Sequence, residues 1–172
     1  MELNERRAVL YVTYLSDIEE FNITKNTDTL KEKWQEAMDY IHDKDFDWVD
    51  IYDNSEEPIG FIIVGHAEQC HPDADIYLAD FFIDYRHRNK GIMTKEIKKI
   101  LKGVKTCCYF VQKNNNYAQR WLNRIFLDDN FVSVKLNKSC IDFSDEDRGF
   151  YGWSRSKINT SVIENNFNII TK

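Results

Sequence analysis

The stretch "YRHRNKGIM" (residues 85–93) gathers groups that bind anions, with Arg86, Arg88 and Lys90 around a single Gly91. It follows the apolar run "IYLADFFI" and precedes "TKEIKKILKGV", whose apolar residues have helical spacing. The pattern predicts a strand that ends in a basic turn and opens a helix. Free N–H groups and the helix dipole at that point favour a phosphate or pyrophosphate. Gly91 would let the backbone approach phosphate oxygens with no Cβ in the way.

Two common phosphate motifs are absent from the chain. It contains neither GxxxxGK[ST], the P-loop, nor GxGxxG, the dinucleotide fingerprint. The turn by itself therefore predicts an anion site, and basic side chains that simply point to water are the alternative.

Charge is unevenly distributed along the chain, whose net charge is -6, a value that argues against a nucleic-acid partner. Residues 15–57 carry 14 acidic side chains against 4 lysines, whereas residues 86–105 carry 8 basic side chains against Glu96 alone. This favours a molecule that binds an anion on one side and meets a cation on the other. Two solvated helix faces are the alternative.

Composition indicates an ordinary globular protein. With 172 residues, 42% hydrophobic and 14% aromatic, we expect one domain over residues 1–172. There is no long apolar stretch of the kind that spans a membrane and no secretory signal at the start, so we expect a soluble, cytoplasmic protein with no membrane partner. The cysteines have no metal-site spacing, which predicts no metal and buried, reduced thiols. They are Cys70, Cys107, Cys108 and Cys140.

The order of apolar patterns predicts an α/β fold. Its centre is a mixed, mostly antiparallel sheet of about seven strands with flanking helices. The expected strands are 8–15, a hairpin within 46–68, 76–83, 106–112, 131–136 and 149–154, and the expected helices are 27–43, the segment after Gly91, and 114–129. We expect the core to cover about residues 8–155. The tail, 157–172, would be frayed or lie at an interface.

Two of these segments carry a resemblance. "FFIDYRHRNKGIM" resembles the acetyl-CoA-binding motif R/Q-x-x-G-x-G/A of the GNAT superfamily of N-acetyltransferases, with Arg88 and Gly91 at matching positions and Met93 where Gly or Ala is usual. "NNNYAQRWL" resembles the family's N-x-x-A segment, with Asn115 and Ala118 at the matching spacing. The predicted element order is also similar to that family's.

The resemblance implies a GNAT-like acyl-CoA N-acyltransferase fold and an enzyme that transfers an acetyl group from acetyl-CoA to an amine by direct attack on the thioester. Acetyl-CoA would be a co-substrate, held partly through the main chain of Phe82 and Ile83. Asn115 would be a CoA ligand or, alternatively, only a helix N-cap. The pyrophosphate loop would comprise Arg88, Asn89, Lys90, Gly91, Ile92, Met93 and Thr94.

The resemblance also suggests acid–base residues. Asp80 lies where relatives often carry a glutamate and is the candidate base, unless it is solvated or only orients the substrate. Glu68 and His66 are alternatives, although His66 could equally be a polar residue at a sheet edge. The position of the family's usual acidic tyrosine is Leu122 here, so the general acid stays unassigned.

The acidic first third favours a cationic acceptor, such as a polyamine, an aminoglycoside-like amine or a protein amino group. The sequence also leaves open a non-catalytic CoA-binding or regulatory module that kept the cofactor site, since Met93 and Leu122 depart from the family pattern. A homodimer is possible, and the sequence fixes neither the acceptor nor the oligomeric state.

Overall fold

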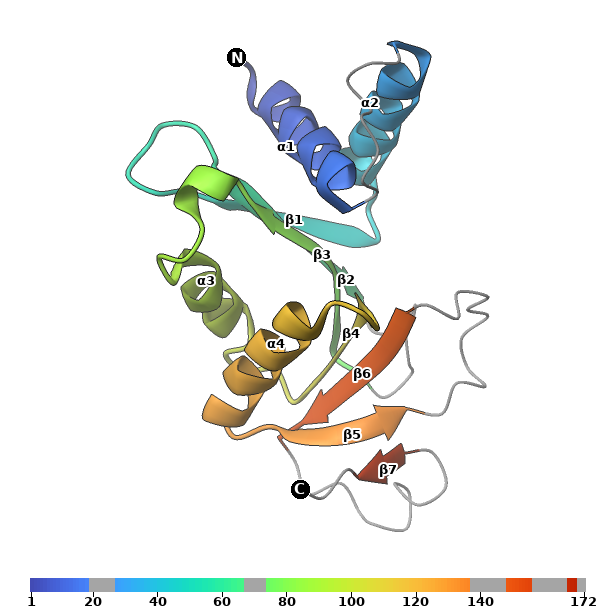
Figure 1. Ribbon diagram of the computed structural model, residues 1–172, viewed down its shortest axis with the longest axis vertical. Coiled ribbons are helices and arrows are strands. Elements are labelled where there is room, and N and C mark those ends of the chain that lie inside the picture. Colours follow the sequence, from blue (N-terminus) through green and yellow to red (C-terminus); the bar gives the residue numbers. More distant parts are fainter. Residues whose placement is uncertain (19–26, 67–73, 137–147, 156–166, 170–172) are drawn as a thin grey trace. The chain divides into compact units, whose positions relative to one another are not determined.

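The computed structural model describes residues 1–18, 27–66, 74–136, 148–155 and 167–169 (Figure 1). The chain forms two compact units. The first comprises Met1–Val64 with Asp80–Glu96, and the second comprises Gly65–Ala79 with Ile97–Lys172. The expectation of one domain over the whole chain stays a prediction.

The fold is a mixed α/β arrangement, as predicted. Its strands are hydrogen-bonded in the order β1-β2-β3-β4-β6-β5-β7, with β3 parallel to β4 and the pairs β4–β6, β5–β6 and β5–β7 antiparallel. The predicted sheet of about seven, mostly antiparallel strands is therefore confirmed. The elements are α1 (Leu3–Ile18), α2 (Thr27–His42), β1 (Phe46–Ile51), β2 (Gly60–His66), β3 (Ile76–Ile83), the short 3₁₀ helix η3 (Tyr85–His87), α3 (Ile92–Ile100), β4 (Thr106–Gln112), α4 (Asn116–Asp128), β5 (Val132–Leu136), β6 (Arg148–Ser154) and β7 (Phe167–Ile169).

One predicted strand is wrong, because residues 8–15 lie inside α1. The run is rich in β-branched and aromatic residues, which suggested a strand, but Ala8, Tyr11, Val12 and Leu15 are all buried. Their spacing of i, i+3, i+4 and i+7 is that of one helix face, and packing of that face outweighs local propensity. The seventh strand is instead β7, from the tail, which pairs with β5.

An aromatic cluster forms the core of the first unit around Phe61 on β2. The Phe61 ring centroid lies 4.6 Å from that of Trp48 on β1, 5.9 Å from that of Tyr11 and 5.8 Å from that of Tyr14, both on α1. It also lies 6.0 Å from the Phe82 ring on β3. The fully buried rings of this cluster each contribute on the order of 2 kcal/mol through their removal from water, and the half-buried Trp48 and Tyr14 contribute less, which together holds α1 against these strands.

The strand β2 runs close to the end of β3. The Ile59 N–H donates to the Ile51 oxygen at 2.8 Å, and the Ile59 oxygen accepts from the Asp84 N–H at 2.9 Å. A Cβ at Gly60 would lie only 2.4 Å from the Phe82 carbonyl oxygen. Glycine at this position therefore allows the approach that fixes where β3 ends and the basic turn begins.

The second unit has its own core between α4 and the sheet. Leu122 and Phe126 of α4 are fully buried, and the Phe126 ring stacks on Trp153 of β6 with centroids 5.0 Å apart. The Trp153 indole N–H donates to the Tyr109 hydroxyl at 3.0 Å. The predicted strands and helices of this unit are thus confirmed. Its thiols at 107 and 108 are buried and not joined in a disulfide with any described residue, whereas Cys70 and Cys140 lie outside the described residues.

Among the residues that the structure describes, no helix combines the length and apolar character needed to cross a membrane. Within the same residues, no group of three or more His, Cys, Asp or Glu side chains is arranged to hold a metal ion.

Candidate functional site

The turn after β3 is shaped by its own acidic residue. Asp84 is the N-cap of η3, and its carboxylate accepts from the Arg86 backbone N–H at 3.0 Å and pairs with the Arg86 guanidinium at 2.9 Å. These hydrogen bonds, chiefly that of the Arg86 side chain, lower the pKa of Asp84 to about 2. Arg86 is therefore engaged in holding the turn together.

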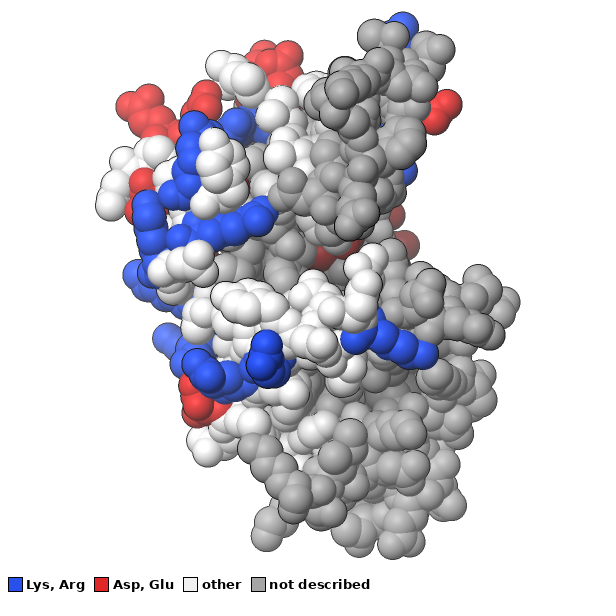
Figure 2. All heavy atoms as spheres, viewed as in Figure 1, with Lys and Arg blue, Asp and Glu red and all other residues white. Residues whose placement is uncertain are grey.

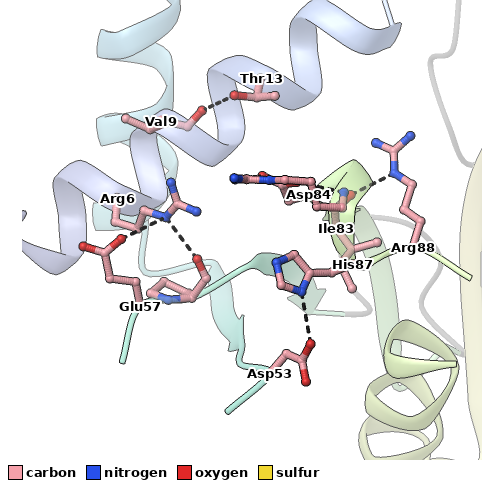
Figure 3. Close-up of polar contacts among 11 residues, drawn as sticks. Arg6, Val9, Thr13, Asp53, Glu57, Ile83, Asp84, His87 and Arg88 are labelled. Atoms are coloured by element: carbon pink, nitrogen blue, oxygen red, sulfur yellow. Dashed lines mark hydrogen bonds and ion pairs between the residues drawn. The ribbon is translucent and has the colours of Figure 1, made fainter. Parts of the chain in front are cut away.

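The other basic residues of the turn also have protein partners (Figure 3). The Arg88 Nε donates to the Ile83 carbonyl oxygen at 2.9 Å, and its guanidinium lies 5.4 Å from the centre of the Phe82 ring. The His87 Nδ1 lies 3.0 Å from the Asp53 carboxylate. Asp53 lies in the turn between β1 and β2, so this contact ties the basic turn to that hairpin.

The backbone of the predicted pyrophosphate loop contains two residues with positive φ. Asn89 has φ +61° and Gly91 has φ +74°, while Lys90 between them has a negative φ. In known anion sites, alternating left- and right-handed residues turn successive N–H groups toward one side, and the two positive φ values here are compatible with such a loop. The Lys90 ammonium nitrogen lies 4.0 Å from the Asp53 carboxylate, so the positive charge of Lys90 is partly compensated.

The loop leads directly into α3. The Lys95 N–H donates to the Gly91 oxygen at 3.0 Å, so the helical bonds begin at Gly91. An α-helix does not pair its first N–H groups within itself, and those groups lie at this end. The first turn of α3 carries no acidic residue. Figure 2 shows basic side chains gathered on this face, where Arg86, Arg88 and Lys90 are exposed.

Met93, the departure from the resembled motif, has a buried side chain, 8% exposed. Its side chain therefore contributes to the core, and the neighbouring Ile92 and Thr94 are half-buried. The Met93 side chain is thus buried in the protein, and the loop before it has the positive φ values at Asn89 and Gly91 described above.

Asp80, the candidate base, lies on β3 and is half-buried. Its Oδ1 accepts a hydrogen bond of 2.5 Å from the Tyr14 hydroxyl on α1. Sequence reasoning missed Tyr14, because it assigned residues 8–15 to a strand. The helical spacing of the buried positions 8, 11, 12 and 15 was the signal that would have placed Tyr14 on a helix.

The structure brings together in the first unit Asp80, Phe82, Ile83 and the loop from Arg88 to Thr94. Asn115 and His66 belong to the second unit, and Glu68 lies outside the described residues. Asn115 is the N-cap of α4, where its side-chain oxygen accepts from the Ala118 N–H at 3.0 Å. His66 is exposed at the end of β2. The assigned roles of all these residues remain predictions.

The general acid stays unassigned in α4. Leu122, at the position of the usual tyrosine, is completely buried and has no proton to donate. Tyr117, the nearest phenol in this helix, is 68% exposed in the first turn.

Comparison with known proteins gives one family. The sequence profile of the acetyltransferase (GNAT) family matches residues 12–126. A search of curated proteins gave no match.

Three solved structures illustrate the similarity of the fold. The protein PH1933 from Pyrococcus horikoshii is 12% identical with a TM-score of 0.63, and the match covers 91% of this chain and 92% of that one. A GNAT-family acetyltransferase from Staphylococcus aureus is 15% identical with a TM-score of 0.56, over 89% and 93%. The PaiA N-acetyltransferase from Thermoplasma acidophilum, solved in complex with coenzyme A, is 16% identical with a TM-score of 0.51, over 87% and 89%.

Proposed function

Because the chain belongs to the acetyltransferase (GNAT) family, we propose that it transfers an acetyl group from acetyl-CoA to an amine nitrogen of a small molecule or a protein. The observation that carries this proposal is the loop between β3 and α3. Its alternating backbone and the start of α3 fit a pyrophosphate, and the similar PaiA enzyme was solved with coenzyme A bound.

The loop would bind acetyl-CoA chiefly through its backbone. N–H groups of the loop after Arg88 would donate to pyrophosphate oxygens, whereas the Arg88 N–H itself donates to the Tyr85 oxygen at 3.3 Å. Gly91 would admit the phosphate oxygens, since a Cβ there meets no protein atom within 4 Å. The main chain of Phe82 and Ile83 would hold the pantetheine arm. Asn115 would contribute through its amide NH₂, because its side-chain oxygen already serves as the N-cap acceptor.

Asp80 would be the general base. As an ionised carboxylate it would accept a proton from the substrate ammonium, which leaves the nitrogen lone pair able to attack the thioester carbonyl. The new C–N bond then forms, the C–S bond breaks, and the thiolate departs with the electron pair. The nitrogen loses its second proton to solvent as the amide forms. Because the basicity of the thiolate is modest, it can leave without a general acid and then takes up a proton from solvent. His66 and Glu68 remain alternative bases.

A groove in the first unit supports a cationic acceptor. It has a volume of about 550 Å³ and is lined by Glu32, Gln35, Glu36, Asp39, Tyr40, Asp43 and Phe46. The Tyr40 and Phe46 rings lie 5.2 Å apart, and the Lys33 ammonium pairs with Glu36 at 3.1 Å. Carboxylates beside aromatic faces suit an ammonium group with an apolar spacer. Glu36 in turn accepts from Tyr11, the neighbour of Tyr14 on α1.

Thermal melting tests the cofactor. We expect acetyl-CoA and CoA, each at millimolar concentration, to raise the melting temperature, because a ligand that binds only the folded state stabilises it. ATP serves as the control for a general phosphate effect and should raise it less. If neither CoA form shifts the melting temperature, the cofactor assignment and the roles that depend on it are wrong.

Thiol release tests catalysis. Wild-type protein with acetyl-CoA is screened against polyamines, aminoglycosides and a lysine-containing peptide, and release is expected with at least one of them. Asp80→Asn should lower the rate at least tenfold with CoA binding unchanged. Binding of CoA with no release for any amine would instead indicate a non-catalytic CoA-binding module.

A further inference from the structure

The hydrogen bond between Tyr14 and Asp80 joins α1 to the strand that carries the candidate base. The Tyr14 hydroxyl lies 2.5 Å from Asp80 Oδ1, across 66 positions in the sequence. The Tyr14 ring is held by neighbours on three sides, with centroid distances of 5.9 Å to Tyr11, 5.8 Å to Phe61 and 6.0 Å to Phe82. Packing of the Tyr14 ring against these neighbours therefore places its hydroxyl beside the Asp80 carboxylate.

We propose that Tyr14 is a positioning residue for Asp80. Its hydroxyl fixes the orientation of the carboxylate and favours the ionised form, which is the form that accepts the ammonium proton. This inference rests on the proposed function, since it assigns Tyr14 a role in the same reaction. Tyr14 does not itself exchange a proton with the substrate.

The surroundings of the carboxylate support this direction of the hydrogen bond. From α1, the Tyr14 hydroxyl donates to the carboxylate and Tyr11 lies close enough to interact with its charge, and Glu36 of α2 accepts from the Tyr11 hydroxyl at 3.2 Å. Burial, followed by the charges of Asp80 and Glu36, raises the pKa of Tyr11, so this phenol stays neutral. A neutral Tyr14 hydroxyl that donates to the Asp80 carboxylate stabilises its negative charge.

Tyr14→Phe removes the donor and keeps the ring that packs on Phe61 and Phe82. We expect kcat for acetyl transfer to fall about tenfold, with the KM for acetyl-CoA unchanged. The acid limb of the kcat/KM profile should move about one pH unit higher, because the ionised carboxylate loses a hydrogen bond. Thr13→Ala is the control: it removes an exposed hydroxyl of the same helix, which donates to the Val9 oxygen at 2.8 Å, and its acid limb should coincide with that of the wild type.

A second measurement does not require turnover. Carboxyl ¹³C resonances titrated by NMR, with Asp80 assigned through Asp80→Asn, should show Asp80 protonating about one pH unit higher in Tyr14→Phe than in the wild type. Coincident titrations, or coincident pH–rate profiles in an active wild type, would overturn the role of Tyr14 while the proposed function stands. If the wild type releases no thiol with any amine, the proposed function fails first, and the role of Tyr14 in catalysis fails with it.

Discussion

Gly91 and Gly103 offer a matched pair for testing the pyrophosphate loop, because they lie at opposite ends of α3. Gly91 has φ +74° and Gly103 has φ +78°, and a Cβ added at either position meets no protein atom within 4 Å. Replacement by alanine therefore imposes the same backbone strain at both sites and no steric clash. Only Gly91 lies in the loop that we propose to hold the pyrophosphate.

The cost to stability follows from the left-handed backbone. An alanine in this conformation costs about 1–2 kcal/mol, which for a protein of this length lowers the melting temperature by about 2–8 °C. We expect Gly91→Ala and Gly103→Ala to fall in that range and to agree with each other. Stability alone thus gives no distinction between the two variants.

Affinity for acetyl-CoA should separate them. A methyl group at position 91 would keep phosphate oxygens from the loop N–H groups, at a cost of one or two hydrogen bonds to a charged group. Such bonds are worth about 1.5–3 kcal/mol each, so the Kd of Gly91→Ala should rise at least tenfold. Gly103→Ala should bind as the wild type does.

Isothermal titration calorimetry with CoA measures both variants at a temperature well below their melting transitions. An equal Kd for Gly91→Ala, Gly103→Ala and the wild type would refute the placement of the pyrophosphate at this loop. An equal loss of affinity in both variants would also refute it, because the effect would then come from strain in α3.

Three further predictions concern stability. Gly60→Ala should lower the free energy of unfolding by about 2 kcal/mol in urea titrations, because its Cβ would lie 2.4 Å from the Phe82 oxygen; an unchanged midpoint would contradict this. Arg155→Lys should lower it by about 2–3 kcal/mol, since the guanidinium donates to oxygens of Leu101, Val104 and Asp129, and a midpoint within error of wild type would disprove it. The pKa of Asp84 is lowered to about 2, so its stabilising effect is present above about pH 4 and is lost as the pH falls toward 2; wild type and Asp84→Asn should differ at pH 6 and converge in acid, and a constant difference would exclude this origin.

Much of the fold was predictable because its signals are local. The run 76–83 followed by a glycine-bearing turn and a helical pattern gave β3, the loop and α3, and the spacing of apolar residues in 114–129 gave α4. Each of these elements buries a face whose period is visible in a short window. The sheet of seven strands followed from the order of these windows.

The helix α1 was not predicted, because its sequence carries two signals that disagree. The run 8–15 is rich in valine, leucine and tyrosine, which have strand propensity or fit either structure. What decides is the aromatic cluster around Phe61, which receives Tyr11 and Tyr14 from a single helix face. That cluster is assembled from residues about 50 positions away, and the sequence shows no direct trace of it.

The electrostatics of the turn also differ from what the sequence implied, and the difference changes which atoms must bind the anion. Arg86 and Lys90 looked like phosphate ligands, yet Arg86 pairs with Asp84 at 2.9 Å and Lys90 lies 4.0 Å from Asp53. Asp53 reaches the turn from the hairpin between β1 and β2, a long-range contact that no local window contains. With the charges of Arg86 and Lys90 partly compensated by protein carboxylates, a pyrophosphate held here as we propose would be attracted mainly by backbone N–H groups, the α3 dipole and Arg88. An anion site built in this way depends on the left-handed conformations at Asn89 and Gly91, so its specificity resides in the backbone and only its long-range attraction in the basic side chains.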